Sequence, residues 1–505
     1  MVQPINNGIY TREDLWGLAA WDPTLVWYAK AMGAMFQLPI SNASSWRYQA
    51  AIHGYDGTMP QLQALAQPGE TLPDDADTYW KRCQHHGWFF LPWHRGYLGY
   101  FERIVRKTIV GLGGPAEWAL PYWNYSDTGQ NADVARLVRP EFLATQLPDG
   151  SANALFQGVV RGRYQLADTP KGQAADFGIG PKDVRLKCLT YNHFYDSASA
   201  SSFGGGQTAF SHGEGGVDVS GGVEKTPHDN VHGDLGGWMG SFETAGLDPL
   251  FWLHHANIDR LWAVWAADPG HAEPPDASWL DPTGSGFPYQ FHDENGVSQV
   301  VKPSDVLDTA ASVFTYRYQD TSVPAQVAAF AARLPAAITT PPAAVAAPSP
   351  PLQAPQLAGA SDTNIDLSPA QVSVDLPIRA QAPTVDLAAG TGARRIYLNV
   401  ESVVGGGQLD TRYVYLNPPN TQTPDEEPEL YAGSLPMFGV AEMSRSVAAN
   451  GGNGKNFVLN VTDVVAHLQQ TGRWDGQLVR VYIVAKNPPA SDTTLTAGRI
   501  SLYYR

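Results

Sequence analysis

The chain has 505 residues, of which 43% are hydrophobic and only 16% are charged, so it can form two to four domains around a large buried core. Its formal net charge of −16 argues against sequence-independent binding to nucleic acids or to anionic membranes, because both require a basic surface. No apolar run reaches the length of a membrane span.

Only two cysteines are present, Cys83 and Cys188, so we expect no disulfide framework. The first residues show no basic segment followed by an apolar core, which is the pattern of a secretory signal. Both features favour a cytoplasmic location. A processed secreted protein would have the same sequence.

In chain order, the first expected elements are two helices with recognisable ends. Asp22 and Pro23 form a cap followed by proline, which opens a helix to about Leu38. A second helix carries His53 and stops at Gly54, a typical C-terminal glycine.

A third helix is expected to open at Pro92 and to run to a glycine cluster at 111–114. His94 then lies in its first turn. His85 is nine positions earlier, about half a turn out of phase, so it must reach any shared site from the preceding loop.

The stretch 226–265 predicts two further helices with histidines on one face. His228 and His232 are four apart and stack one turn above the other, with Thr226 as N-cap. A second helix begins after Asp248, and His255 falls on its apolar stripe.

A buried imidazole must find a polar partner or a metal. For His255 alone, a hydrogen-bonded core histidine is the commoner interpretation. Beside the His228/His232 pair, the ligand interpretation is favoured, and three neutral imidazoles without a nearby cysteine suit copper or zinc. The trio His53, His85 and His94 predicts a second metal, with both metals held between antiparallel helices of a four-helix bundle.

The other histidines lack this patterning. His86 and His254 are out of register and are placed outside the metal ligands. Four more are interpreted as surface residues: His193, His271, His292 and His467.

The composition shifts to Ala and Pro in residues 321–364, which predicts an extended linker between a first domain, 1–320, and a second, 365–505. Beyond the linker the hydrophobic period becomes two, as in 395–400 and 478–484, with Gly, Asn and Pro turns between the runs. We expect this second domain to be an all-β sandwich-like unit.

These motifs resemble those of a known family. Gln-Ala-Ala-Ile-His53-Gly, Phe-Leu-Pro-Trp-His94-Arg, His228-x-x-x-His232 and Asp-Pro-Leu-Phe-Trp-Leu-His-His255-Ala-Asn-Ile-Asp-Arg-Leu-Trp are similar to the two copper motifs of type-3 dinuclear copper tyrosinases and polyphenol oxidases. The resemblance covers roughly residues 1–320 and, more weakly, the C-terminal domain. It implies two copper ions, one bound by His53, His85 and His94 and the other by His228, His232 and His255, with O₂ as co-substrate.

The resemblance implies further site residues. The Cys83-x-His85 spacing is that of fungal members with a thioether between the cysteine sulfur and the imidazole. Glu224, four before His228, matches a glutamate that fixes a water near the coppers and can serve as a base for the phenol. Asp229 departs from the asparagine often found in strong monophenolases; it could assist Glu224 or disturb the water.

Two carboxylates close to the helical histidines, Glu102 and Asp259, can be read either as partners that orient the imidazoles or as structural ion pairs with Arg95 or Arg260. The Tyr316-Arg-Tyr318 segment resembles the family's tyrosine motif, with Arg12 as its stacking partner.

The C-terminal domain resembles the domain that covers the copper site in latent plant and fungal forms. Its segment Tyr431 to Gly439 contains Leu435, Met437 and Phe438 in an expected loop, and we expect Phe438 to be the plug. Packing of these side chains into the domain's own core is the alternative.

The expected activity is that of a tyrosinase, linked to melanin-type chemistry, which oxidises monophenols and o-diphenols to o-quinones. The alternatives are a catechol oxidase that acts on diphenols only, a haemocyanin-like oxygen-binding protein and a zinc-binding structural protein. The expected partners are small phenols, with neither nucleic acid nor membrane, and the oligomeric state is open.

Overall fold

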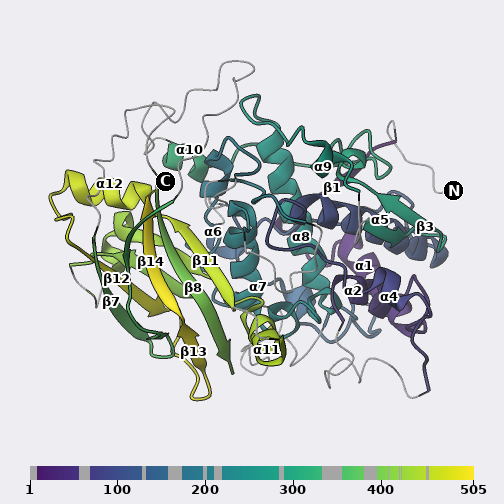
Figure 1. Cartoon of the computed structure of the whole chain (residues 1–505). Helices are drawn as coiled ribbons and strands as arrows, with labels where there is room; N and C mark the ends of the chain where they lie inside the picture. Colours follow the sequence, from purple (N-terminus) through teal and green to yellow (C-terminus); the bar gives the residue numbers. More distant parts are fainter. Residues whose placement is uncertain are drawn as a thin grey trace.

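The computed structural model describes residues 8–55, 69–127, 132–156, 173–196, 202–209, 219–283, 289–331, 355–379, 395–407, 409–419, 421, 424–450 and 454–504. They form a helical half (8–331) and a β-rich domain (355–504), which lie side by side (Figure 1). This confirms the prediction of a mainly helical first part followed by a β-rich second part.

Four helices build the centre of the helical half: α1 (Pro23–Gln37), α2 (Trp46–His53), α5 (Phe90–Gly111) and α8 (Pro249–Ala266). α5 packs against α1 and α8, and α2 packs against α1. Two of these helices begin as their sequences predict, because the carboxylate of Asp22 accepts from the amide of Thr24 and that of Asp248 from the amide of Leu250, each at 2.9 Å.

Two helix starts differ from the prediction. α5 begins at Phe90, before Pro92, so His94 lies in its second turn. The expected helix at 227 is a π-helical segment, η6 (Glu224–Asp229), with extended backbone at Thr226, followed by the six-residue α7 (Asn230–Leu235). The regular four-helix bundle is therefore not observed, since one of its members is short and kinked.

Besides the elements named above, the described helical half contains short helices and strands. They are β1 (Tyr10–Arg12), η1 (Leu15–Gly17), α4 (Ala76–Tyr79), α6 (Ala132–Ala135), η2 (Pro140–Phe142), η5 (Lys187–Thr190), η7 (Gly237–Gly240), η8 (Ala245–Leu247), α9 (Ala277–Leu280), β2 (Tyr289–His292), β3 (Ser298–Val301), η9 (Pro303–Asp305), β4 (Tyr316–Tyr318) and α10 (Ala325–Ala331). Strands β1 and β4 pair in parallel, and β2 pairs antiparallel with β3.

The β-rich domain contains two antiparallel sheets. One has the order β10-β9-β12-β7, and the other has the order β5-β14-β8-β13-β6, with β11 also paired to β8. Their strands are β5 (Gln356–Ala360), β6 (Ile365–Asp366), β7 (Gln371–Pro377), β8 (Ile396–Gly406), β9 (Arg412–Leu416), β10 (Tyr431–Leu435), β11 (Lys455–Asn460), β12 (Leu478–Ala485), β13 (Thr494–Ala497) and β14 (Arg499–Tyr504).

The two sheets share one apolar core, with Val414 and Val481 from the first sheet and Leu398 and Leu502 from the second. The domain is not all-β, because α11 (Val440–Asn450) and α12 (Thr462–Gln470) also belong to it, together with η10 (Pro424–Glu426) and η11 (Pro428–Leu430). The predicted linker of residues 321–364 contains α10 at its start and β5 near its end, while its centre, 332–354, lies outside the described residues. Strand β5 pairs with β14 and therefore belongs to the β-rich domain, so the domain includes residues before 365.

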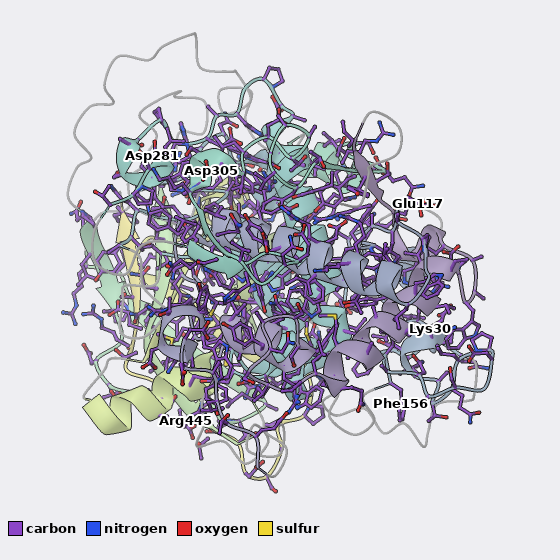
Figure 2. All side chains as sticks on the ribbon, turned by 90° about the vertical axis from the view of Figure 1, so that its right-hand side faces the viewer. Lys30, Glu117, Phe156, Asp281, Asp305 and Arg445 are labelled. Carbon is purple, nitrogen blue, oxygen red and sulfur yellow. The ribbon has the colours of Figure 1, made fainter. Side chains whose placement is uncertain are left out.

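The halves meet along β11, α11 and the loop after β10 (Figure 1). Charged side chains labelled in Figure 2, such as Lys30 on α1, Asp281 and Asp305, lie at the periphery of the molecule. Among the described residues, the helices are all too short or too polar to cross a membrane.

Candidate metal centre

The structure brings the six predicted ligand histidines together in the interior of the helical half. His53 ends α2, His94 lies on α5, His232 on α7 and His255 on α8, while His85 comes from the loop before α5 and His228 from η6. All six are buried, with at most 6% of any residue exposed. The loop position of His85 agrees with the phase argument from its spacing to His94.

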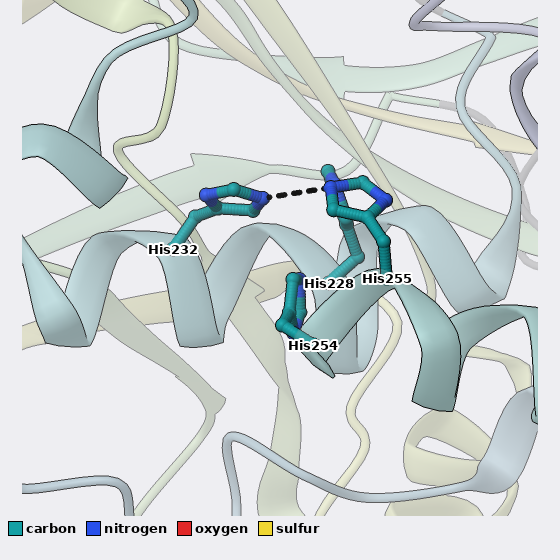
Figure 3. Close-up of side chains that lie close together, drawn as sticks. All are labelled: His228, His232, His254 and His255. Carbon is teal, nitrogen blue, oxygen red and sulfur yellow. Dashed lines mark hydrogen bonds between the residues drawn. The ribbon is translucent and has the colours of Figure 1, made fainter. Parts of the chain in front are cut away.

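The six rings form two trios that face each other. In the first trio, the ring centroids of His53, His85 and His94 are 5.1–5.6 Å apart. In the second, those of His228, His232 and His255 are 4.5–5.4 Å apart. The trios touch where His94 stacks on His255 with centroids 4.4 Å apart. Figure 3 shows the second trio, with Nε2 of His232 3.3 Å from Nε2 of His255.

Hydrogen bonds fix the orientation of four rings through Nδ1. Three rings use backbone carbonyls at 2.7–2.8 Å: His53 on Phe242, His94 on Phe90, and His232 on Met239. His228 uses the carboxylate of Asp229 at 2.8 Å. When Nδ1 carries the proton in such a bond, Nε2 keeps its electron pair for a metal.

The protonation of the rings fits metal binding. Burial lowers the pKa of His94, His228 and His255 well below the ordinary value, and that of His232 to about 3. The rings are therefore neutral near pH 7. The Nε2 atoms of His94 and His228 are buried and have no hydrogen-bond partner in the described part of the chain, which is costly unless a metal occupies that side. Neutral imidazoles alone suit copper or zinc.

His254 lies closer to the cluster than its register predicts. It is fully buried, its ring is 4.7 Å from that of His232, and it could contribute a ligand atom to the second trio (Figure 3). Its Nδ1 lies 2.9 Å from the hydroxyl of Tyr125, which gives it a polar partner of its own. The surface prediction for His292 is wrong, because the rings of Tyr48 and Tyr79 cover it and only 6% is exposed.

Cys83 is buried beside the first trio. Its sulfur lies within 4.8 Å of a ring nitrogen of His53 and of His85. Burial raises the pKa of the thiol well above its ordinary value. The thioether to His85 stays a prediction, for which this proximity is a necessary condition.

The two predicted carboxylates flank the centre. Glu224 is fully buried, and one of its oxygens accepts from the backbone amide of His86 at 2.6 Å, so it touches the loop that carries His85. Asp229 is 2% exposed and holds His228. Their catalytic roles stay predictions.

Phe438 of the β-rich domain lies over the second trio. Its ring stacks on His232 with centroids 4.2 Å apart and an interplanar angle of 14°, and it contacts the edge of Phe242 at 4.4 Å. Only 1% of Phe438 is exposed. By contrast, Leu435 ends strand β10, and Leu435 and Met437 both pack in the core of their own domain, so the expected loop placement of Leu435 is wrong.

Two residues near the centre were not predicted from the sequence. The first is Phe242, whose ring lies on His85 at 4.6 Å while its carbonyl orients His53. The second is Lys455 on β11, whose ammonium donates to the carboxylate of Asp229 at 3.0 Å and to the carbonyl of Phe438 at 2.8 Å. Lys455 and Asp229 are 1% and 2% exposed, so this ion pair is buried.

Glu102 and Asp259, for which the sequence allowed two interpretations, form structural ion pairs. Asp259 binds Arg95 and accepts from the two tyrosine hydroxyls of β4, near the end of the helical half. Glu102 binds Arg12 and Arg106. Arg12 lies 3.6 Å above the ring centroid of Tyr316, as the motif predicted. These groups join the two ends of the helical half.

Comparison with known proteins identifies the family. A family model described as the common central domain of tyrosinase matches residues 43–268. A tyrosinase of a Hahella strain, HcTyr1, is 33% identical over 98% of this chain and 99% of its own length. The chain belongs to the type-3 copper tyrosinase family. The tyrosinase-like chain is accordingly a copper phenol oxidase, and both histidine trios are compatible with the dinuclear copper site that the family implies.

Other similar proteins agree with this assignment. A chloroplastic polyphenol oxidase of Malus domestica is 30% identical over 59% of the tyrosinase-like chain and 46% of its own length. The structure of a latent aurone synthase superposes with a TM-score of 0.61 at 20% identity over 99% of this chain and 90% of that one. The structure of latent apple tyrosinase superposes with a TM-score of 0.57 at 22% identity, over 99% of this chain and 98% of that one. These structures share the fold. A second family model, described only as a domain of unknown function, matches residues 354–505.

Proposed function

We propose that this protein is a tyrosinase that oxidises both monophenols and o-diphenols to o-quinones with O₂. The observation that carries this proposal is the position of Glu224 and Asp229, two buried carboxylates at the histidine cluster. Oxidation of a monophenol starts from a phenol whose proton must be removed, and a carboxylate close to the site is a suitable base. The named tyrosinase that matches the whole chain supports the same assignment.

The two trios would hold one copper ion each, and the bound pair would supply the electrons that activate O₂. The carbonyls of Phe90, Met239 and Phe242 keep three rings in their orientation, and Asp229 does so for His228. Glu224 is placed to accept a proton beside the His85 loop. The buried aromatic side chains around the cluster exclude water.

The test is to incubate the copper-loaded protein with tyrosine and with L-DOPA. We expect oxidation of both. Oxidation of L-DOPA alone would indicate a catechol oxidase and would contradict the monophenolase assignment. Metal analysis should give two coppers per chain, and about one metal per chain would contradict the proposed ligand sets.

We also propose that the β-rich domain covers the copper site and keeps the intact protein nearly inactive, with Phe438 in the place of a substrate ring. The stacking of Phe438 on His232 supports this role, and so does its absence from the apolar core of its own domain. A ring at that position competes with any phenol that approaches the second trio.

Cleavage in the segment 340–350 followed by removal of the domain should raise catechol oxidation, chiefly for bulky catechols. A trimmed protein that stays soluble and copper-loaded without becoming more active would show that the domain instead assists folding or copper loading.

A further inference from the structure

A cavity of about 430 Å³ lies between the helical half and the β-rich domain, apart from the copper ligands. None of the six ligand histidines lines it. Its volume falls within the usual range for small-molecule sites, and boundaries between domains are common places for such sites. The cavity is therefore large enough for a ligand of its own.

The helical half contributes a cationic wall to this cavity. Four of its lining side chains are basic: Lys182, Arg185, Lys187 and Lys225. Two of the lining side chains in the described part of the chain are acidic, Glu429 and Asp463. A local excess of positive charge is unusual in a chain with a net charge of −16, and it favours an anionic ligand.

Arg185 is the cation best placed to bind such a ligand. Lys182 and Lys187 already have carboxylate partners, Asp425 and Asp463. Arg185 has neither a hydrogen bond nor an ion pair within the described ranges; its guanidinium lies 4.6 Å from the ring centroid of Tyr431. A guanidinium that makes no hydrogen bond to the protein has its N–H groups available for two parallel bonds to a carboxylate.

The β-rich domain contributes an apolar wall opposite these cations. Val458, Leu459, Val464 and Ala466 line that side. A bare inorganic anion would leave this wall without contacts. A small carboxylate with an apolar body would use both walls.

Short segments connect the cavity to His228 of the second trio and to Phe438, which lies over that trio. Lys225 lies three residues before His228, and Ser434 lies four residues before Phe438. The Ser434 hydroxyl also lies 3.1 Å from the side-chain amide nitrogen of Asn230, across the boundary. A ligand in the cavity would contact both halves at once and would bind the closed arrangement in preference to a separated one.

We propose that this cavity is a binding site for a small organic carboxylate, which holds the β-rich domain against the helical half and so lowers phenol oxidation by the intact chain. The effect on activity rests on the proposed covering role of the domain, whereas the binding itself does not. Arg185 binds the carboxylate group, and the wall of α12 and β11 binds the apolar body.

The test uses the intact, copper-loaded protein and cyclohexanecarboxylate as the probe, with binding measured by titration calorimetry. We expect one site per chain, with binding at least tenfold weaker for the neutral cyclohexanecarboxamide and for Arg185→Gln, as for the loss of one charge-assisted hydrogen-bonded pair. Ala466→Met should narrow the cavity at the other wall and also weaken binding. Arg317→Gln, at an exposed arginine of β4 outside the cavity, is the matched control and should bind normally.

Equal binding by Arg185→Gln and the unmodified chain would place the anion elsewhere and overturn the site. Inorganic phosphate binding as tightly as cyclohexanecarboxylate would overturn the apolar-body assignment. The probe should also slow catechol oxidation by the unmodified chain and not by Arg185→Gln. Normal binding without slowing would overturn the coupling to the cover and leave the site in place, so failure of the site and failure of the covering role can be distinguished.

Discussion

Replacing Lys455 by methionine tests whether the buried ion pair with Asp229 keeps the β-rich domain closed over the copper site. Methionine has a similar length and no charge. The substitution removes the ammonium from Asp229 and from the carbonyl of Phe438, so the buried Asp229 carboxylate loses the cation that lies beside it in the closed form. The carboxylate can recover its hydration only if the domain separates.

The expected magnitude follows from the burial of the pair. Both partners are at most 2% exposed, and removing one partner of such a pair costs about 3–5 kcal/mol. Because about 1.4 kcal/mol corresponds to a factor of ten, the closed form loses roughly two to three and a half orders of magnitude in the equilibrium constant. Lys187→Met is the matched control: Lys187 and Asp463 also pair across the boundary, but they are 36% and 42% exposed, and such pairs contribute about 0–1 kcal/mol.

The assay is the initial rate of catechol oxidation by the uncleaved, copper-loaded protein, with the cleaved protein as the upper limit. Lys455→Met should raise kcat/KM at least tenfold, or to that limit, and Lys187→Met should change it little. Asp229 also orients His228, so each rate is divided by the rate of the same variant after cleavage. On this scale the double variant Asp229→Asn/Lys455→Met should be less active than Lys455→Met alone, because the buried charge is gone. Equal effects of the two lysine substitutions, or a double variant as active as Lys455→Met, would refute the ion-pair argument. Copper content must stay at two per chain in every variant.

Three further predictions concern the centre and its cover. In copper-matured protein, the peptide that contains Cys83 and His85 should be about two daltons lighter than its sequence predicts, because a thioether between them removes two hydrogens. Cys83→Ser should show no such loss. An unchanged mass in the parent chain would contradict the bond. Glu224→Gln should lower tyrosine turnover about tenfold or more and L-DOPA turnover less, whereas equal losses would indicate damaged copper binding. Burial, and next the charge of Glu243 across the boundary, raise the pKa of Glu442 on α11 from about 4.5 to about 7. Between these pH values, the Glu442 carboxyl is protonated in the closed form and ionised in the open form. The cover should therefore loosen as pH rises from about 4.5 to about 7, seen as a rise in catechol oxidation by the uncleaved protein relative to the cleaved protein at the same pH, and Glu442→Gln should remove that dependence.

Local chemistry explains what could be predicted from the sequence. The caps at Asp22 and Asp248 are short-range signals, and α1 and α8 begin where these caps predict. The four-residue spacing of His228 and His232 is also a local signal, and their rings do lie together, although the backbone there is η6 followed by α7 and not one regular helix. The alternating runs at 395–400 and 478–484 correspond to β8 and β12 of the β-rich domain. The spacing of Val464, Val465 and Leu468 is typical of one face of a helix, and it is a local signal for α12, which is not among the predicted elements.

The remaining features depend on contacts between residues far apart in the chain. Phe242 contacts His53 across 189 positions of the chain, and Lys455 contacts Asp229 across 226 positions. No sequence periodicity relates residues that far apart. One signal for Lys455 existed: it alternates with Phe457 and Leu459 on the buried face of β11, where a charge requires a partner. The partner itself could not be known without the fold.

The lysines that the β-rich domain places against the helical half have a consequence for the uncovered enzyme. Lys455 neutralises Asp229, and Lys486 bridges Asp183 and Asp234 at 2.6 and 2.5 Å. When the domain leaves, it takes both cations away and leaves three carboxylates on the newly exposed face. That face would attract cationic phenols such as tyramine and repel phenols that carry a carboxylate, and the preference should fade in high salt. Activation would then change which phenols the enzyme selects, in addition to how fast it oxidises them.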